Sequence, residues 1–236
     1  MIVLNRSAFL VGTLLTLSFF GVLALIFMPL FGEGRNGLQY ADDMFNRLSK
    51  GSSYFIPKVT KSSAAQAGKP FAIEIRLADA VQAERIAVVL RPAEVQVERS
   101  AAGLKLSGDL GRMLALALRD AEDGYHNDAA AIEARHGLDV REVLATWWQL
   151  LQQIDKSLKL ELRLDEAKAV HEVMKKAIEP AHNYFGIEAE QVRDLAPEMI
   201  GLLVFYVLYT MWWGFAIFYL FEGMGLVMKK KAGAGH

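Results

Sequence analysis

Two long apolar stretches, one near each end of the chain, enclose a mostly polar segment. Residues 8–31 (AFLVGTLLTLSFFGVLALIFMPLF) and 200–221 (IGLLVFYVLYTMWWGFAIFYLF) contain no charged residue. A helix rises about 1.5 Å per residue, so each stretch is long enough to cross the roughly 30 Å hydrocarbon core of a bilayer. The pattern predicts a membrane hairpin that carries one domain between its two spans.

The charges beside these stretches predict the side of the membrane on which the domain lies. Arg6 precedes the first stretch, whereas Lys229, Lys230 and Lys231 follow the second. Because cytoplasmic flanks carry an excess of lysine and arginine, we expect both termini in the cytoplasm, at a bacterial inner membrane. The lysine cluster is also expected to contact anionic lipid head groups. The expected segments are a cytoplasmic N-terminus at 1–7, a span at 8–31, a periplasmic domain at 32–198, a span at 199–228 and a cytoplasmic basic tail at 229–236.

The first stretch is expected to remain on the protein as an anchor and not to be cleaved as a signal peptide. Its apolar run is longer than that of a signal peptide. It also ends in Met28-Pro29-Leu30-Phe31, where a signal peptide would have a small-residue cleavage site. We therefore expect two membrane helices.

A small β segment is expected in the first half of the enclosed domain. Apolar and polar residues alternate over Phe71–Leu77 and Val95–Glu98, as they do in half-buried strands. A denser apolar run at Ile86–Leu90 and the short Leu104–Leu106 predict further strands. Three or four antiparallel strands would form a sheet that needs helices against its apolar face.

Helical periodicity dominates the second half of the domain. Asp109 and Asp139 are candidate N-caps, Gly124 is expected to break or kink the first helix, and Pro180 to break the last. The expected elements are helices at 42–48, 109–118, 129–136, 139–154 and 165–178, an extended peptide at Tyr54–Pro57 and a small-residue linker at 62–68. The predicted fold class is therefore an α+β membrane protein, in which two transmembrane helices flank a mostly helical extracytoplasmic domain with a small antiparallel β segment.

Composition narrows the possible chemistry. The chain has no cysteine, which excludes disulfides, iron–sulfur clusters, thiolate zinc sites and thioether-linked haem. Its formal net charge is -1, and no basic stripe suggests a nucleic-acid partner. We expect a protein that binds other proteins and lipid.

Two Glu-x-x-His pairs are candidate metal ligands. Glu133 and His136 form the first pair, and Glu179 and His182 the second; the spacing of three places each pair on one helix face. Two such pairs with two further glutamates are the ligand set of a di-iron bundle. The further glutamates would come from Glu122, Glu142, Glu166 and Glu172. Alternatively, both histidines are last-turn residues favoured by the helix dipole, and no cofactor is bound.

The adjacent tryptophans Trp147 and Trp148 suggest a protein interface. Consecutive side chains on a helix diverge by about 100°, so both rings can hardly face one core. We expect one in the core and the other at an interface, where tryptophan is enriched.

The second apolar stretch raises a conflict over its depth in the membrane. A span at 200–221 places Trp212 and Trp213 mid-membrane, where each indole N–H needs a partner. A span near 209–228 makes Tyr209 and the tryptophans an interfacial belt but buries Glu222. Partner helices would relieve either conflict, and Gly12 and Thr16 of the first stretch permit close helix contact.

These patterns favour a non-catalytic accessory subunit of a multi-subunit membrane complex, such as a respiratory, transport or envelope assembly, or a homo-oligomer. Its membrane helices and its external domain would each contact partner subunits. One alternative is an extracytoplasmic sensor or ligand-binding module that signals through a separate chain. The other is a membrane-anchored metal protein that uses the two Glu-x-x-His pairs.

Overall fold

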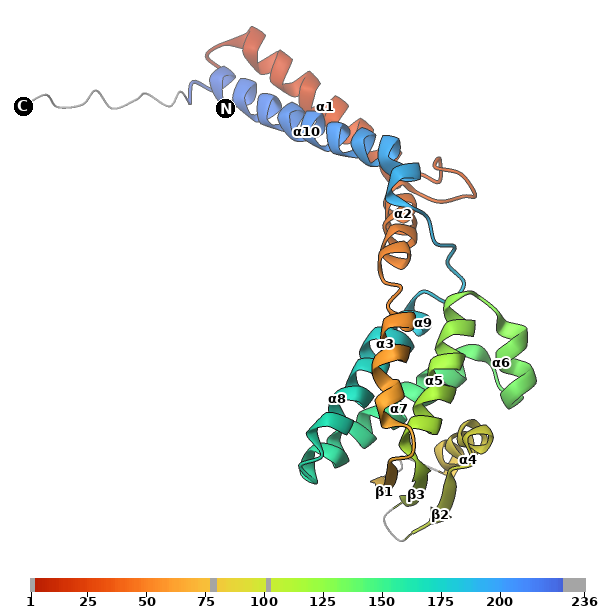
Figure 1. Ribbon diagram of the computed structural model, residues 1–236. Helices are drawn as coiled ribbons and strands as arrows, with labels where there is room; N and C mark the ends of the chain where they lie inside the picture. The colour runs from red at the N-terminus through yellow and green to blue at the C-terminus, as the bar shows by residue number, and fades with distance from the viewer. Residues whose placement is uncertain (1–2, 77–79, 101–102, 227–236) are drawn as a thin grey trace, which may run out of the picture. The chain divides into compact units, whose positions relative to one another are not determined.

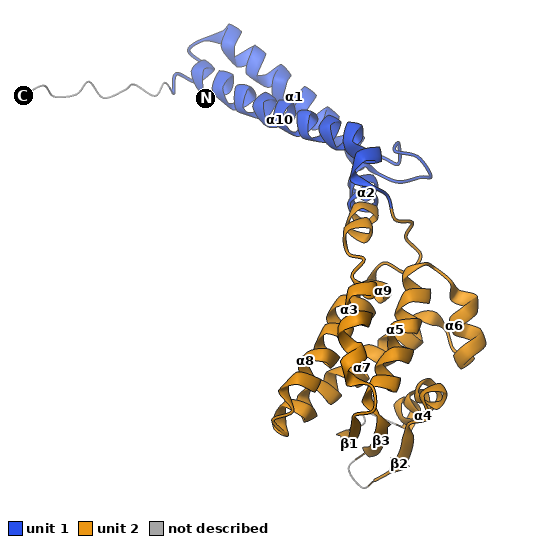
Figure 2. Ribbon diagram, viewed as in Figure 1, with its two compact units in different colours: residues 1–45, 190–236 blue, residues 46–189 orange. Residues whose placement is uncertain are grey.

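The computed structural model describes residues 3–76, 80–100 and 103–226. It divides into two compact units, which Figure 2 colours separately. Residues 1–45 and 190–236 form the first, here called the hairpin unit, and residues 46–189 form the second, here called the globular domain. The predicted cluster Lys229, Lys230 and Lys231 lies outside the described residues.

The hairpin unit contains two long helices that lie side by side, α1 (Arg6–Phe27) and α10 (Val192–Gly223) (Figure 1). They run antiparallel, and glycines bring their backbones close together. A Cβ atom added at Gly12 would lie 2.6 Å from the backbone nitrogen of Leu220. Gly12 therefore permits close helix packing, as predicted, but the helix it packs on is α10 of the same chain.

Both helices are long and apolar enough to cross a membrane, and the globular domain is mostly helical with one small sheet. The predicted combination of two candidate membrane helices with a mostly helical domain and a small antiparallel sheet is therefore confirmed. The helix bounds differ from the predicted spans. α1 ends at Phe27 because Met28 is extended, the conformation favoured before Pro29. α10 begins seven residues before the predicted residue 199 and ends at Gly223.

The sheet of the globular domain has three antiparallel strands, β1 (Pro70–Arg76), β2 (Gln96–Arg99) and β3 (Gly103–Asp109), in the order β1-β3-β2. Leu106 of β3 pairs with Ile73 on one side and with Val97 on the other. Alternate residues of β1 are buried, so one face of the sheet contributes to the core. These strands match three of the four predicted runs.

The fourth predicted strand is wrong, because Ile86–Leu90 forms the end of helix α4 (Ala80–Leu90). Ala83, Ile86 and Leu90 are buried, and their spacing of three and four residues follows one helix face. A short apolar run fits a buried helix as well as a strand, and here the residues before it complete the helix.

The segment before the sheet is more helical than predicted. α2 runs over Gly37–Ser52, well beyond the expected 42–48. The expected extended peptide at Tyr54–Pro57 is wrong from Phe55 onward. Phe55 has right-handed helical backbone angles, and α3 (Ile56–Ser63) begins directly after it with Pro57 in its first turn, where proline needs no N–H partner. The expected linker at 62–68 is likewise wrong, since α3 is followed directly by the 3-10 turn η1 (Ala64–Gln66).

The later helices largely follow the sequence signals. Asp109, Asp128 and Asp139 each cap a helix through the side chain, and Gly137 ends α6 in the left-handed conformation. The elements are η2 (Arg91–Ala93), α5 (Leu110–Tyr125), α6 (Ala129–His136), α7 (Val140–Leu160), α8 (Leu164–Val173), the π turn η3 (Met174–Ile178) and α9 (Glu179–Asn183).

The predicted break near Gly124 is confirmed, because α5 ends at Tyr125 and α6 is a separate helix, whereas the predicted break at Pro180 is wrong. Gly124 lies in the last turn of α5, and a Cβ atom there would lie 2.9 Å from a methyl carbon of Leu144, so this glycine lets α5 and α7 approach closely. Pro180 lies in the first turn of α9, and the π turn η3 joins α9 to α8 without a break in the helical path. The helical path therefore continues to Asn183, which brings Glu179 and His182 alongside α7.

Candidate functional site

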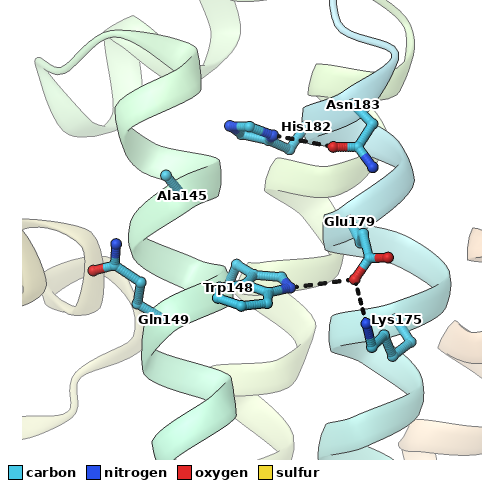
Figure 3. Close-up of a pocket in the computed structure, with 7 residues that line it drawn as sticks. All are labelled: Ala145, Trp148, Gln149, Lys175, Glu179, His182 and Asn183. Atoms are coloured by element: carbon cyan, nitrogen blue, oxygen red, sulfur yellow. Dashed lines mark hydrogen bonds and ion pairs between the residues drawn. The ribbon is translucent and has the colours of Figure 1, made fainter.

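A pocket lies between α7 and the η3–α9 segment in the globular domain (Figure 3). Its volume is about 420 Å³. Three of the residues singled out in the sequence, Trp148, Glu179 and His182, meet at this pocket. The lining residues are Ala145, Trp148, Gln149, Lys175, Glu179, His182 and Asn183.

The two adjacent tryptophans of α7 have different environments. Trp147 is fully buried in the core, whereas Trp148 is half-buried and its ring lies in the pocket between the two helices (Figure 3). This is the divergence expected for consecutive residues of a helix. The contact of Trp148 with a partner remains a prediction.

The carboxylate of Glu179, which lines the pocket, is held by two donors. Lys175 Nζ donates to Glu179 Oε2 at 2.7 Å, and Trp148 Nε1 donates to the same oxygen at 3.3 Å. The bond from Lys175, against the opposing effect of burial, lowers the pKa of Glu179 below its ordinary value. Glu179 is therefore ionised at neutral pH and fixes the orientation of the Trp148 ring.

A second pocket adjoins the first and shares Ala145, Gln149 and His182 with it. We call the two together the α7 groove. Its further lining residues come from α4 and from the first turns of α7; they are Gln82, Arg85, Arg141, Glu142 and Thr146. The groove therefore extends along the exposed face of α7.

Polar side chains along the second pocket are oriented by their neighbours. Arg85 forms an ion pair with Glu142 at 2.9 Å, and Gln82 Nε2 donates to Gln149 Oε1 at 2.9 Å. Arg141 donates to the carbonyl of Phe185 at 3.3 Å and lies 5.7 Å from the centre of the Phe185 ring. These contacts hold the polar side chains of the second pocket in fixed orientations beside the aromatic surface of Trp148.

The structure separates the two Glu-x-x-His pairs. His136 is buried and lies 2.8 Å from Asp120, whereas Glu133 is exposed. The two side chains of the first pair therefore do not lie together at one site. In the second pair, the Glu179 carboxylate accepts hydrogen bonds from Lys175 and Trp148. Within residues 3–76, 80–100 and 103–226, no group of three or more histidine, aspartate and glutamate side chains is placed to hold a metal ion. The described residues give the di-metal hypothesis no support.

Asp120 is the centre of a buried ionic cluster that the sequence analysis missed. Its carboxylate is fully buried and accepts hydrogen bonds from Arg135 and, at 2.7 Å, from Trp147 Nε1, in addition to its contact with His136. Burial alone would lower the pKa of Arg135, but its bonds to Asp123 and Asp120 raise it. Asp120 stands on the apolar stripe of α5, and a charged residue in such a stripe is the signal that predicts a buried ion pair.

Two polar side chains of α10 find backbone partners on α1. Tyr209 donates to the carbonyl of Phe19 and Trp212 to the carbonyl of Leu15, each at 3.1 Å. The Trp213 ring packs on Phe19, with ring centres 4.7 Å apart. The indole N–H of Trp212 therefore has a partner within the chain, and its contact with a partner helix remains a prediction.

Thr16 and Glu222, which were also predicted to lie at an interface, have different surroundings in the structure. The Thr16 hydroxyl donates to the carbonyl of Gly12 at 2.8 Å, which is a bond within α1. Glu222 is half-buried in the last turn of α10, and its depth in a bilayer remains a prediction.

Three features thus stand out in the described residues: the α7 groove, the buried cluster around Asp120 and the internally bonded hairpin. Of these, the α7 groove is open to a partner. No protein-family model, curated protein or solved structure matches this chain, so its interpretation rests on this geometry.

Proposed function

We propose that this chain is a non-catalytic accessory subunit of a membrane complex, anchored by α1 and α10, whose globular domain binds a partner subunit through the α7 groove. The observation that carries the proposal is the half-buried ring of Trp148, oriented in an open groove by its bond to Glu179. Tryptophan and arginine in preorganised concave sites are the residues that contribute most to protein–protein binding energy.

The outer surfaces of α1 and α10 support membrane anchoring. Large apolar side chains project from both helices and remain exposed in the hairpin, among them Leu10, Leu14, Leu17, Leu203, Phe215 and Phe218. An apolar surface of this extent is unfavourable in water. Lipid tails or the helices of partner subunits would cover it, whereas the backbone polar groups are already bonded within the helices.

The proposed topology follows from the flanking cations. Arg6 precedes α1, and Lys229, Lys230 and Lys231 follow α10 in the sequence. An excess of cations marks the cytoplasmic side, so both termini lie in the cytoplasm and the globular domain lies in the periplasm. The partner that occupies the α7 groove is then a periplasmic subunit or a periplasmic domain of a membrane subunit.

The chemistry of the groove indicates the kind of segment it would bind. Trp148 supplies an apolar surface, and Arg141 bonds a backbone carbonyl, with no carboxylate partner among the described residues. A partner segment with an apolar side chain next to an acidic one would pack on the indole and pair with the guanidinium.

The test is to solubilise the membranes of the native host in a mild detergent, isolate the tagged full-length chain and measure the mass and composition of what co-purifies. We expect a complex with defined stoichiometry that Trp148→Ala weakens. Leu160→Ala is the matched control, because Leu160 is exposed on the same helix but outside the groove. A native mass equal to one chain plus detergent would contradict the proposal, as would equal effects of the two substitutions.

A further inference from the structure

An apolar groove lies in the hairpin unit, where the end of α1, the first half of α2 and the first part of α10 meet (Figure 2). Its volume is about 860 Å³, within the range of ligand pockets. None of its lining residues is charged, and the hydroxyls of Tyr206 and Tyr209 are the polar side-chain groups among them. All of them belong to the hairpin unit, so this site is separate from the α7 groove.

Helix α2 contributes a stripe of apolar residues to the wall of this groove. Leu38, Ala41 and Phe45 follow one another at spacings of three and four, so they share one helix face. Leu38 and Phe45 are each more than half exposed, as is Leu203 on α10. A continuous apolar surface of this kind is unfavourable in water, so it requires an apolar occupant.

The dimensions of the groove fit one lipid chain. Its lining residues on α10 extend from Met199 to Tyr209, about 15 Å of helix, which is half of the roughly 30 Å hydrocarbon core of a bilayer. At Tyr209 the two membrane helices close together, because its ring stacks on Phe19 with ring centres 4.1 Å apart. A partner helix is about 10–12 Å across, and a 15 Å length of it would fill roughly 1,200 Å³ or more. The groove is too small to enclose such a helix, whereas an acyl chain is thinner and spans one leaflet.

A negative charge lies at the end of the groove next to the membrane surface. Glu198 directly precedes the lining residues of α10 and accepts a hydrogen bond at 2.8 Å from the neutral hydroxyl of Tyr40. In the part of the chain that the structure describes, no ion pair neutralises Glu198. Arg35, which lies 6.0 Å from the centre of the Tyr40 ring, already pairs with Glu33 at 3.1 Å and with Asp43 at 2.7 Å. This end of the groove therefore favours a cationic group over an anionic one.

We propose that this groove binds one phospholipid with an ammonium head group, the chemistry of phosphatidylethanolamine, from the periplasmic leaflet. One acyl chain packs along the apolar residues of α2 and α10, and the ammonium group donates a charge-assisted hydrogen bond to the Glu198 carboxylate. The lipid thus covers Leu38, Phe45 and Leu203 without a partner helix. The inference rests on the membrane anchoring and the topology of the proposed function, but not on the α7 groove.

The experiment is native mass spectrometry of the full-length chain in a non-ionic detergent, titrated either with phosphatidylethanolamine or with phosphatidylglycerol, which has no ammonium group. We expect one phosphatidylethanolamine per chain to stay bound, about threefold more tightly than phosphatidylglycerol, since one exposed ion pair contributes only modestly. Glu198→Gln should remove this preference, because glutamine still accepts from Tyr40 but carries no charge. Equal binding of the two lipids by the unsubstituted protein would overturn the proposal.

A substitution that fills the groove tests where the acyl chain lies. Leu203→Trp places a larger side chain in the groove and should weaken the binding of both lipids by about tenfold. Leu208→Trp is the matched control, because Leu208 is 60% exposed on the same helix, against 62% for Leu203, and does not line the groove. Equal effects of the two substitutions would mean that the lipid does not bind in this groove.

Further measurements separate this inference from the proposed function. Trp148→Ala should leave phosphatidylethanolamine binding unchanged, because Trp148 belongs to the globular domain. If alkaline carbonate extracts the chain from native membranes, the proposed anchoring fails and this inference fails with it. A chain that resists carbonate and still forms the partner complex, but retains no phosphatidylethanolamine, would overturn this inference alone.

Discussion

The buried ammonium group of Lys50 lies 3.2 Å from Oδ1 of Asn127, and together the two residues bind the chain segments at either end of the globular domain. Lys50, only 2% exposed, also donates to the carbonyls of Tyr184 and Ile187. Asn127 accepts from the Gly186 N–H at 2.7 Å. The end of α2 and the segment after α9 are therefore fixed to the same turn between α5 and α6.

Replacement of Lys50 by methionine should destabilise the globular domain by about 3 kcal/mol, because three acceptors lose a charged donor in a buried site. Burial lowers the pKa of Lys50, although the charge of Glu188 opposes this effect. Burial of the ammonium group is unfavourable because water is removed from it, and the three hydrogen bonds offset this desolvation. The measurement is chemical denaturation followed by tryptophan fluorescence. Lys156→Met, at an exposed position of α7, is the control, and equal stability of the two variants would contradict this account.

The cluster around Asp120 should be the most sensitive polar group of the core. Asp120→Ala leaves Arg135 and His136 without their shared buried acceptor and is expected to cost about 4 kcal/mol. Asp123→Ala removes only a half-buried partner of Arg135 at 2.6 Å and should cost about 1 kcal/mol. Denaturation midpoints of the two variants test this difference, and a loss at Asp123 as large as at Asp120 would show that Asp120 is not the centre of the cluster.

The sequence predicted much of the secondary structure, because local signals determine it. The caps at Asp109 and Asp139 and the end of α6 at His136 lie where expected, since each depends on side-chain bonds or backbone freedom within a few residues. The wrong strand at Ile86–Leu90 shows the limit of such signals. Its apolar run fits either element, and its burial as the end of α4 depends on tertiary packing.

The candidate site could be predicted only in part. Trp148 and the Glu179–His182 pair stand out in the sequence, but their meeting depends on how α9 packs along α7. The expected break at Pro180 hid this arrangement, since η3 and α9 continue the helical path past the proline. The partner of Trp212 was likewise hidden, because the carbonyl of Leu15 lies far away in sequence.

The stability of the globular domain should fall at alkaline pH through Tyr54. Burial, with the hydrogen bond to Glu122, raises the pKa of Tyr54 to about 12 from 10.0. The folded protein then keeps this proton between pH 10 and 12 while the unfolded chain loses it, so the stabilisation is complete below pH 10 and disappears as pH rises to 12. Because Tyr54 is 40% exposed, solvent screening limits the effect to about 1 kcal/mol. Denaturation midpoints of the wild type and Tyr54→Phe should converge in this window, and parallel curves would contradict the role of Tyr54.

The close packing of α1 on α10 can be tested with two glycines of the same helix. Gly12 meets the backbone of α10, where an added Cβ atom would lie 2.6 Å from Leu220, whereas nothing lies within 4 Å of a Cβ atom added at Gly21. Gly12→Val should therefore separate the helices and lower the stability of the hairpin in detergent by about 2 kcal/mol, while Gly21→Val should leave it nearly unchanged. Steric trapping or thermal unfolding in micelles measures the difference. Because both substitutions change helix propensity equally, similar losses would mean that α1 and α10 do not pack through Gly12.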